Sequence, residues 1–495
     1  MPKIRHLTLD GRHLEGGGQL LRTAICLSAL TSTPLQIHHI RGNRSGGGGL
    51  KVQHLASVKW LAEACDARVE GGEKGSTDLV FEPGEGRGRG KGKGVDVGGG
   101  GLPAVFRKKT LPLPGGGVGG DKLWEARLEI GTAGSTGLAL QAILPFILFT
   151  KLPGDGQLPV HLTLSGGTNV SGSPSYEYLS QVLLPMLKAI GLPEMKAVLH
   201  RRGWSQGGSS IGSLTIEIPA RKNVVLGGFT LAPSDLLSAM RGPLRRPRQV
   251  TATFIAPTSC HAHLKQVLVT RAREFFAVKS DSTEGDENLP IAIRCADSGH
   301  EKRLYLIAVL TVPIPPTTPS DPTSLNEPAE IILASDWLYD KKISLKSGTS
   351  RLQDEIAEEM AQRVLTELSQ EWRSGAYVDE HLRDQLVIFQ ALAKGRSSVH
   401  PGYANADEAG SGEGGGEGEG EGDGGGGLRE PSLHTQTAEW VVNEILGADF
   451  DGSGGCEGVG FDGSEGIDWV RRVRETKRAK DVEDLSTRID GVDLT

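Results

Sequence analysis

Apolar and polar residues follow two different periods along the first two hundred residues of the chain. Residues 3–10 ("KIRHLTLD") alternate and place Leu7 and Leu9 on one face, as in a half-buried strand. Residues 19–32 ("QLLRTAICLSALTS") carry apolar side chains at helical spacing instead. The alternation continues with "PLQIHHI", "LKVQHLASVKWLAEACDA", "TDLVFEP", "PVHLTLSGG" and "YEYLSQVLLPMLKAIG". We therefore predict an α/β (α+β) fold in which glycine-containing loops join repeated β-α units around one or more sheets.

The pattern changes between residues 222 and 375. This region has fewer glycine loops, strand-like runs such as "QVTATFIA" and "RLYLIAVLTV", and a long polar helix predicted over 351–372. We interpret it as a smaller α/β domain inserted into a large domain that comprises residues 1–221 and 376–450.

Three further segments have a composition that does not suit a packed core. Residues 83–120 and 402–429 are dominated by glycine, the first basic and the second acidic, and we predict that both are flexible insertions. Residues 451–495 are polar and charged, which predicts a loosely ordered tail.

Composition limits the classes of protein that remain. The 495 residues carry a formal net charge of −7, which argues against binding of polyanions by bulk charge but not against a local basic cleft. The five cysteines are scattered, which favours a reducing compartment and excludes a cysteine-based metal site, and Cys26 and Cys65 have apolar neighbours typical of buried positions. There is no apolar signal segment or membrane span, so we expect a soluble intracellular protein with no membrane partner.

Two loops that follow predicted strands have a composition suited to phosphate. In "LEGGGQLLR", glycines precede a helix whose free amide groups favour an anion, Glu15 could hold a metal ion, and Arg22 could reach a phosphate oxygen. A tight turn with a surface carboxylate is the alternative. In "IRGNRSGGGGLKVQHL", Arg41 and Arg44 could grip a phosphodiester backbone, with Gln53 at the start of the next helix, although a solvated basic loop fits as well.

Two later segments repeat the loop-to-helix pattern. "EIGTAGSTGLALQAILP" places Gln141 in an apolar helix, where a core amide is the alternative to a ligand contact, and "SGGTNVSGSPS" supplies Pro174 in a loop. In the helix of residues 377–393, His381, Asp384 and Gln385 share one face, which suits either a ligand or solvent.

His434 stands at the start of a short amphipathic helix, "PSLHTQTAEWVVNEIL", directly after the acidic glycine tract. The positive end of the helix dipole disfavours the imidazolium form, and a neutral imidazole is what a nucleophile requires near pH 7. A histidine that only flanks or caps the helix is the alternative.

Six of these stretches together resemble the RNA 3′-terminal phosphate cyclase family. They occur in the family's order, and "LHTQTA" with "DQLVIF" is similar to the eukaryotic, catalytic type. The matching stretches are "LEGGGQLLRTA", "IRGNR…QHL", "TAGSTGLALQAILP", "SGGTN", "EHLRDQLVIFQALA" and "LHTQTA".

The resemblance implies a large domain of three repeated β-α units, like the C-terminal domain of a translation initiation factor, with a smaller inserted α/β domain. It implies ATP-dependent conversion of an RNA 3′-phosphate into a 2′,3′-cyclic phosphodiester through histidyl-AMP and RNA(3′)pp(5′)A, with Mg²⁺ or Mn²⁺, in the nucleus (nucleoplasm) or also the cytoplasm. It leaves the oligomeric state open. The implied roles are nucleophile for His434, metal ligand for Glu15, RNA or phosphate binding for Arg22, Arg41, Arg44 and Gln53, and ATP or AMP binding for Gln141, Pro174, His381, Asp384 and Gln385.

Two other functions remain as alternatives. The family has a non-catalytic branch that acts in ribosome biogenesis and lacks the nucleophile, so the presence of His434 argues against it. The second alternative is a fold-related enolpyruvyl transferase. The presence of His434 argues against it as well, because that chemistry needs no histidine nucleophile at this position.

Overall fold

The structure is a computed structural model of the chain. It describes residues 5–44, 46–84, 105–111, 120–152, 158–220, 225–233, 246–276, 289–314, 330–341, 349–404 and 427–463.

The first repeat is a four-stranded sheet with two helices. In chain order its elements are β1 (Leu7–Asp10), α1 (Gly18–Thr31), β2 (Leu35–His38), α2 (Val52–Cys65), β3 (Arg68–Glu70) and β4 (Leu79–Glu82). The strand order is β1-β2-β4-β3, with β1 and β2 parallel and β4 antiparallel to both of its neighbours. The alternating and helical periods of the sequence therefore predict this repeat correctly except for the three-residue strand β3, which they do not indicate.

The second repeat has the same order of elements, preceded by one additional strand, β5 (Phe106–Thr110). After β5, it comprises β6 (Lys122–Glu129), α3 (Thr136–Phe149), β7 (Val160–Gly166), α4 (Tyr176–Tyr178), η1 (Leu179–Leu183), α5 (Leu184–Ala189), β8 (Lys196–Arg201) and β9 (Gly212–Ile218). Its sheet runs β5-β6-β7-β9-β8, with β6 and β7 parallel. The single helix predicted for residues 176–191 contains a π-helical turn, η1, just before Pro185, which has no N–H to continue the α-helical bonds.

The third repeat is split by the inserted domain. It comprises β10 (Thr230–Leu231), α9 (Glu380–Leu392), β15 (Lys394–Val399), α10 (Leu433–Leu446) and β16 (Gly455–Val459), with strand order β10-β15-β16. β10 and β15 are parallel and β16 is antiparallel to β15, which matches β1-β2-β4 of the first repeat and β6-β7-β9 of the second. The α/β fold of the prediction is thus confirmed, with three units of one topology.

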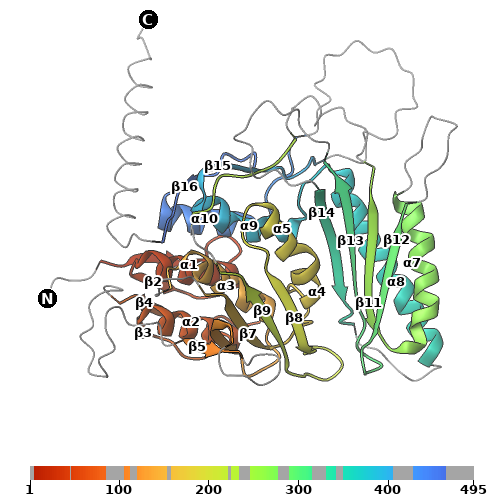
Figure 1. Ribbon diagram of the computed structural model, residues 1–495, viewed down its shortest axis with the longest axis horizontal. Helices are drawn as coiled ribbons and strands as arrows, with labels where there is room; N and C mark the ends of the chain where they lie inside the picture. The colour runs from red at the N-terminus through yellow and green to blue at the C-terminus, as the bar shows by residue number, and fades with distance from the viewer. Residues whose placement is uncertain are drawn as a thin grey trace, which may run out of the picture.

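The inserted domain lies between β10 and α9. It contains β11 (Gln249–Ala256), η2 (Thr258–Cys260), α7 (His261–Phe276), β12 (Ile291–Asp297), β13 (Tyr305–Pro313), β14 (Glu330–Leu338) and α8 (Thr349–Arg373). Its sheet has the order β12-β11-β13-β14, and α7 and α8 pack on one face of it, as Figure 1 shows at the right of the molecule.

Three strands lie where composition predicted something else. β5 falls inside the glycine-rich segment 83–120, where "FRKKT" pairs with β6 and buries only Phe106. β16 falls inside the predicted tail, where "GCEGV" pairs with β15. β10 falls inside the range 222–375 that the sequence predicts as the inserted domain, but it pairs with β15 and so belongs to the third repeat. The rest of both glycine tracts (85–104, 112–119 and 405–426) and residues 464–495 lie outside the described residues.

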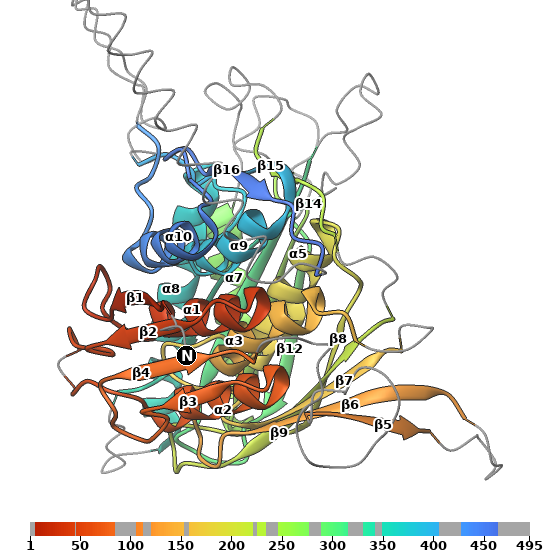
Figure 2. The same ribbon diagram turned by 90° about the vertical axis from the view of Figure 1, so that its left-hand side faces the viewer.

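The helices of the three repeats form a common layer. α1 packs against α2, α3 and α10, and α10 packs against α9, so helices distant in sequence lie side by side in both views (Figures 1 and 2). Every residue of α1 after Gly18 is buried, and Cys26 is fully enclosed, whereas Cys65 at the end of α2 is only partly buried. Among the described residues, none of the helices combines the length and apolar character that crossing a bilayer requires.

Candidate active site

One cleft brings the predicted site residues together. It has a volume of about 950 Å³ and lies between the three repeats and the inserted domain. All eleven residues selected from the sequence line it: Glu15, Arg22, Arg41, Arg44, Gln53, Gln141, Pro174, His381, Asp384, Gln385 and His434.

The repeat topology explains why these residues meet. Glu15 follows β1, Arg41 and Arg44 follow β2, Pro174 follows β7, and His434 follows β15. β1 and β2, β6 and β7, and β10 and β15 are parallel pairs, so the loops at the carboxyl ends of each pair open on the same side. The cleft is therefore built from equivalent loops of three repeats.

Glu15 and His434 face each other at this junction. Nδ1 of His434 lies 3.6 Å from Oε2 of Glu15, whose side chain is only 6 % exposed. The other oxygen of Glu15 is paired with Arg44, and the backbone N–H of Glu15 donates to Thr437 of α10 at 3.2 Å. The glycine loop of the first repeat is thus joined directly to the histidine-bearing helix of the third.

His434 is the second residue of α10. The preceding Ser432 caps the helix by accepting the N–H of Thr435 at 3.2 Å, so the histidine is not the cap and its ring, 49 % exposed, is free to face the cleft. Partial burial, followed by the charges of Arg22 and Arg44, lowers the pKa of His434 below that of free histidine. The ring is therefore neutral at pH 7, as the sequence predicts, but through burial and neighbouring cations.

Two buried arginines form the positive side of the cleft. Arg22 is 8 % exposed and Arg41 is 7 % exposed. Burial lowers the pKa of Arg22 to about 10, although Asp384 opposes the shift, and burial also lowers the pKa of Arg41. Arg22 donates to Gln19 at 2.5 Å through Nη2, and Arg41 donates to the carbonyl of Gly47 at 3.2 Å. Both cations stay charged at pH 7 and are poorly neutralised, which favours an anion.

Gln53 joins the first repeat to the second. Its Oε1 accepts the backbone N–H of Ser135 at 3.0 Å, and Ser135 in turn caps α3 by accepting the N–H of Leu138 at 3.1 Å. The carbonyl end of Gln53 is therefore used structurally, which leaves its amide N–H groups toward the cleft.

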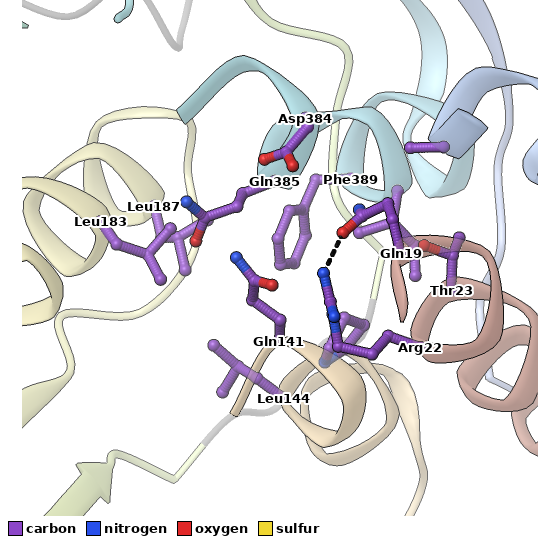
Figure 3. A pocket seen from close by; sticks show the side chains of 13 residues that line it. Gln19, Arg22, Thr23, Gln141, Leu144, Leu183, Leu187, Asp384, Gln385 and Phe389 are labelled. Atoms are coloured by element: carbon purple, nitrogen blue, oxygen red, sulfur yellow. Dashed lines mark hydrogen bonds between the residues drawn. The ribbon is translucent and has the colours of Figure 1, made fainter. Parts of the chain in front are cut away.

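A second, small cavity of about 30 Å³ adjoins the cleft. Its apolar wall includes Leu144, Leu187 and Phe389, and Gln141 and Gln385 reach into it from α3 and α9 (Figure 3). Both glutamine Oε1 atoms are buried, and neither has a hydrogen-bond partner among the described residues. A cavity of this volume has room for about two water molecules and is far smaller than a ligand pocket of about 300 Å³ or more.

Carboxylates gather around His381 on the α9 side. Burial lowers the pKa of His381, but the negative charges of Asp379, Asp336 and Asp384 outweigh this effect. The pKa of His381 is therefore raised overall. Burial raises the pKa of Asp384 to about 7 and that of Asp336 to about 6. This side of the cleft therefore holds protons close to neutral pH, in contrast to the arginine side.

The sequence prediction missed the contribution of the inserted domain. Asp336 lines the cleft from β14, accepting a hydrogen bond from Tyr305 at 2.8 Å, and Trp337 and Arg363 also line it. A single carboxylate in the apolar run "IILASDWL" was the available signal. Lys51 and His54 line the cleft as well, although only their neighbour Gln53 was selected.

Within the described parts of the chain, no three His, Cys, Asp or Glu side chains form a metal-binding group. Glu15 nevertheless fits a divalent cation in one respect, because its Oε2 is buried and accepts no hydrogen bond. A carboxylate oxygen left in this state suits a hard cation that completes its shell with substrate oxygens and water.

Comparison with known proteins agrees with this arrangement. Residues 13–451 match the sequence model of a family described as RNA 3′-terminal phosphate cyclase. The chain is 26 % identical over 449 residues to the RNA 3′-terminal phosphate cyclase of Pyrococcus furiosus, covering 91 % of this chain and 96 % of that protein. It is 30 % identical over 398 residues to the protein of the same name from Ignicoccus hospitalis, covering 79 % and 87 %.

A three-repeat α/β protein with a phosphate-favouring cleft is the class that fold and site define. The match extends over most of the chain, and the chain belongs to the RNA 3′-terminal phosphate cyclase family. The likeness to the eukaryotic type rests on "LHTQTA" and "DQLVIF" alone.

Proposed function

We propose that the chain uses ATP to convert the 3′-terminal phosphate of an RNA into a 2′,3′-cyclic phosphodiester. The observation that carries the proposal is the approach of a neutral His434 to buried Glu15 at a cleft that also holds the buried arginines Arg22 and Arg41. The names of the relatives point to the same activity.

In the first step, Nε2 of His434 attacks the α-phosphorus of ATP. An N–P bond forms, the bond to the leaving oxygen breaks, and diphosphate departs to leave histidyl-AMP. Nδ1 is the ring nitrogen that lies near Glu15, 3.6 Å from Oε2, which leaves Nε2 as the nitrogen for the reaction.

In the second step, a 3′-phosphate oxygen of the RNA attacks the phosphorus of the AMP, and the N–P bond breaks to restore the imidazole. In the third step, the vicinal 2′-hydroxyl attacks the activated 3′-phosphorus and loses its proton, and AMP leaves. This chemistry requires RNA rather than DNA, since DNA has no 2′-hydroxyl. The overall change is a ligase-class reaction that yields AMP and diphosphate.

The two sides of the cleft suit two parts of the reactants. Arg22, Arg41, Arg44 and Gln53 would hold the RNA end and the phosphates, where charge accumulates on non-bridging oxygens. Gln141, Pro174, His381, Asp384 and Gln385 would hold the nucleoside of ATP. Their shared place in the large cleft, with the unpartnered amide oxygens of Gln141 and Gln385, supports that assignment.

Glu15 would hold Mg²⁺ or Mn²⁺. When bound, the cation would neutralise part of the charge on the phosphates. The unpartnered buried Oε2 supports Glu15 as its ligand, and the ion pair with Arg44 would keep the carboxylate oriented.

Incubation with α-labelled ATP and Mg²⁺ or Mn²⁺ tests the proposal. Wild-type protein should acquire label that is stable to alkali and labile to acid, as expected for a phosphoramidate, and His434→Ala should acquire none. His263→Ala is a matched control, because His263 lies on α7 of the inserted domain and pairs with Glu358. In parallel, the end-label of an RNA with a 3′-phosphate should become resistant to phosphatase.

Unlabelled wild-type protein would instead favour the non-catalytic ribosome-biogenesis alternative. A nuclear location is likewise a proposal, which rests on the motif resemblance alone, and fractionation of cells that express the tagged chain would test it.

A further inference from the structure

His54 is a buried cleft residue that the mechanism above does not use. It lies at the third position of α2, it is 4 % exposed, and it lines the cleft together with Gly18, Arg22, Arg41 and Lys51. Its neighbours are cations and the first turn of α1.

The hydrogen bond made by one ring nitrogen determines what the other can do. Nδ1 of His54 accepts the backbone N–H of Lys51, the residue that precedes α2, at 3.4 Å. A neutral imidazole carries one proton, so an acceptor at Nδ1 requires the proton to be on Nε2. No described residue makes a hydrogen bond with Nε2, which leaves an unused N–H donor.

Gly18 shows where this donor lies. A Cβ added to Gly18 would be 2.8 Å from Nε2 of His54 and 2.9 Å from Nη1 of Arg22. The two donors therefore converge on the first turn of α1, where the free backbone N–H groups of a helix start also favour an anion. Only glycine at position 18 leaves room for both the imidazole of His54 and the guanidinium group of Arg22.

The surroundings keep His54 uncharged. Burial, followed by the charges of Arg22, Arg41 and Lys51, lowers its pKa to about 3. The ring therefore adds a hydrogen-bond donor without adding a fourth positive charge to the cluster, and it is too weak a base to remove a proton at neutral pH.

We propose that Nε2–H of His54 donates a hydrogen bond to the 3′-terminal phosphate of the RNA, beside the guanidinium group of Arg22. This inference rests on the proposed cyclase function and adds a residue to it. The bond stabilises the bound RNA end and the charge that develops when its phosphate attacks the AMP on His434.

The test separates the RNA step from the ATP step. Protein carrying labelled AMP is freed of ATP and mixed with an RNA ending in a 3′-phosphate, and the single-turnover rate of AMP transfer is measured against RNA concentration. His54→Ala should form the labelled protein at the wild-type rate but transfer AMP about 10- to 100-fold less efficiently, which is the loss expected for one hydrogen bond to a charged group. Lys59→Ala, on the exposed face of α2, should leave both rates unchanged.

Two amide variants distinguish phosphate binding from helix capping. His54→Gln can place an N–H near the position of Nε2, whereas His54→Asn can accept the N–H of Lys51 in place of Nδ1 but cannot reach the phosphate. The proposal is supported if His54→Gln, but not His54→Asn, recovers much of the rate of AMP transfer that His54→Ala loses. Recovery in Asn alone, in parallel with recovery of the unfolding temperature, assigns His54 to the helix cap and overturns it.

The preference for a terminal phosphate gives a further readout. RNA ending in a 3′-phosphate should compete better than the same RNA ending in a 3′-hydroxyl with wild-type protein, and His54→Ala should lose about tenfold of that preference. An unchanged preference, or a slow first step with normal transfer, overturns the proposal. If wild-type protein forms no labelled intermediate, it is the cyclase function that fails.

Discussion

Tyr305 of the inserted domain and Ser175 of the second repeat bring their hydroxyl oxygens to 2.6 Å from each other, and both side chains are buried. Tyr305 gives its only proton to Asp336, so the hydroxyl of Ser175 donates to Tyr305. Asp340 accepts from Ser171 at 3.2 Å, and the N–H of Ala334 donates to Asp379 at 3.2 Å. The inserted domain therefore supports both the loop that carries Pro174 and the start of α9.

Removal of the Tyr305 hydroxyl should loosen this support. Tyr305→Phe removes the donor to Asp336 and the acceptor of the Ser175 hydroxyl proton, so we expect a loss of about 1–3 kcal/mol in the free energy of unfolding, measured by urea denaturation. Tyr176→Phe is the matched control, because its hydroxyl makes a single bond to a carbonyl in a partly buried place and should cost less. Equal losses in the two variants would contradict this account of the domain contact.

Glu15→Gln should slow the first step of the reaction. An uncharged amide is a weaker ligand for a divalent cation and cannot hold Arg44, so the rate of labelling from α-labelled ATP should fall about 10- to 100-fold. Glu73→Gln, a change at an exposed position of the first repeat, should not alter the rate. Raising the concentration of Mn²⁺ should restore part of the lost activity if the carboxylate acts through the cation.

Arg44→Ala should change the pH dependence of the same step. Arg44 contributes to the lowered pKa of His434, so its removal raises that pKa. Because the neutral ring is the reactive form, the acid limb of the labelling rate should lie below the value of about 6.5 for free histidine in wild-type protein and should move to higher pH in the variant. A limb that stays in place would mean that Arg44 does not act on the ring of His434.

Asp384 should make stability depend on pH near neutrality. Its pKa is raised to about 7 by burial, whereas the unfolded chain titrates near the ordinary value of about 3.9. Between about pH 4 and 7, Asp384 therefore carries a proton in the folded protein but not in the unfolded chain. The stability that this proton contributes is complete near pH 4 and is lost as the pH rises toward 7.

Asp384→Asn should remove that dependence. We expect the unfolding free energy of the variant to vary less over this interval, by on the order of 1–3 kcal/mol. Denaturation at a series of pH values measures the difference, and Asp340→Asn, at an exposed rim position, should keep the wild-type slope. Parallel slopes in all three proteins would exclude Asp384 as the source.

The sequence predicts local elements well, because they depend on neighbours in the chain. Leu7 and Leu9 mark β1, and the apolar spacing of α1 and α10 agrees with their burial. His434 could be selected because a helix start is visible in "PSLHTQTAEW". The arrangement of equivalent loops around one cleft could only be expected through the family resemblance.

Pairing between distant segments is what local patterns do not contain. β10 has two residues and no period to detect, and β16 lies in a polar, glycine-rich segment, so only their contacts with β15 define them as strands. The unusual titration of Asp336 and Asp384 likewise arises from burial between domains. Gln141 was weighed as either a core amide or a ligand contact, and the structure places it at a cavity where both descriptions apply.

The position of the inserted domain also sets an order of assembly during synthesis on the ribosome. Thr230 emerges early, but its partner Ser398 follows only after the whole inserted domain has been made. The first two repeats and the inserted domain can thus fold before β15, the pairing partner of β10, has been synthesised. Pairing between segments so far apart in the chain is slow. Since His434 is added later still, the residues of the proposed site can come together only after both the inserted domain and α10 have been made.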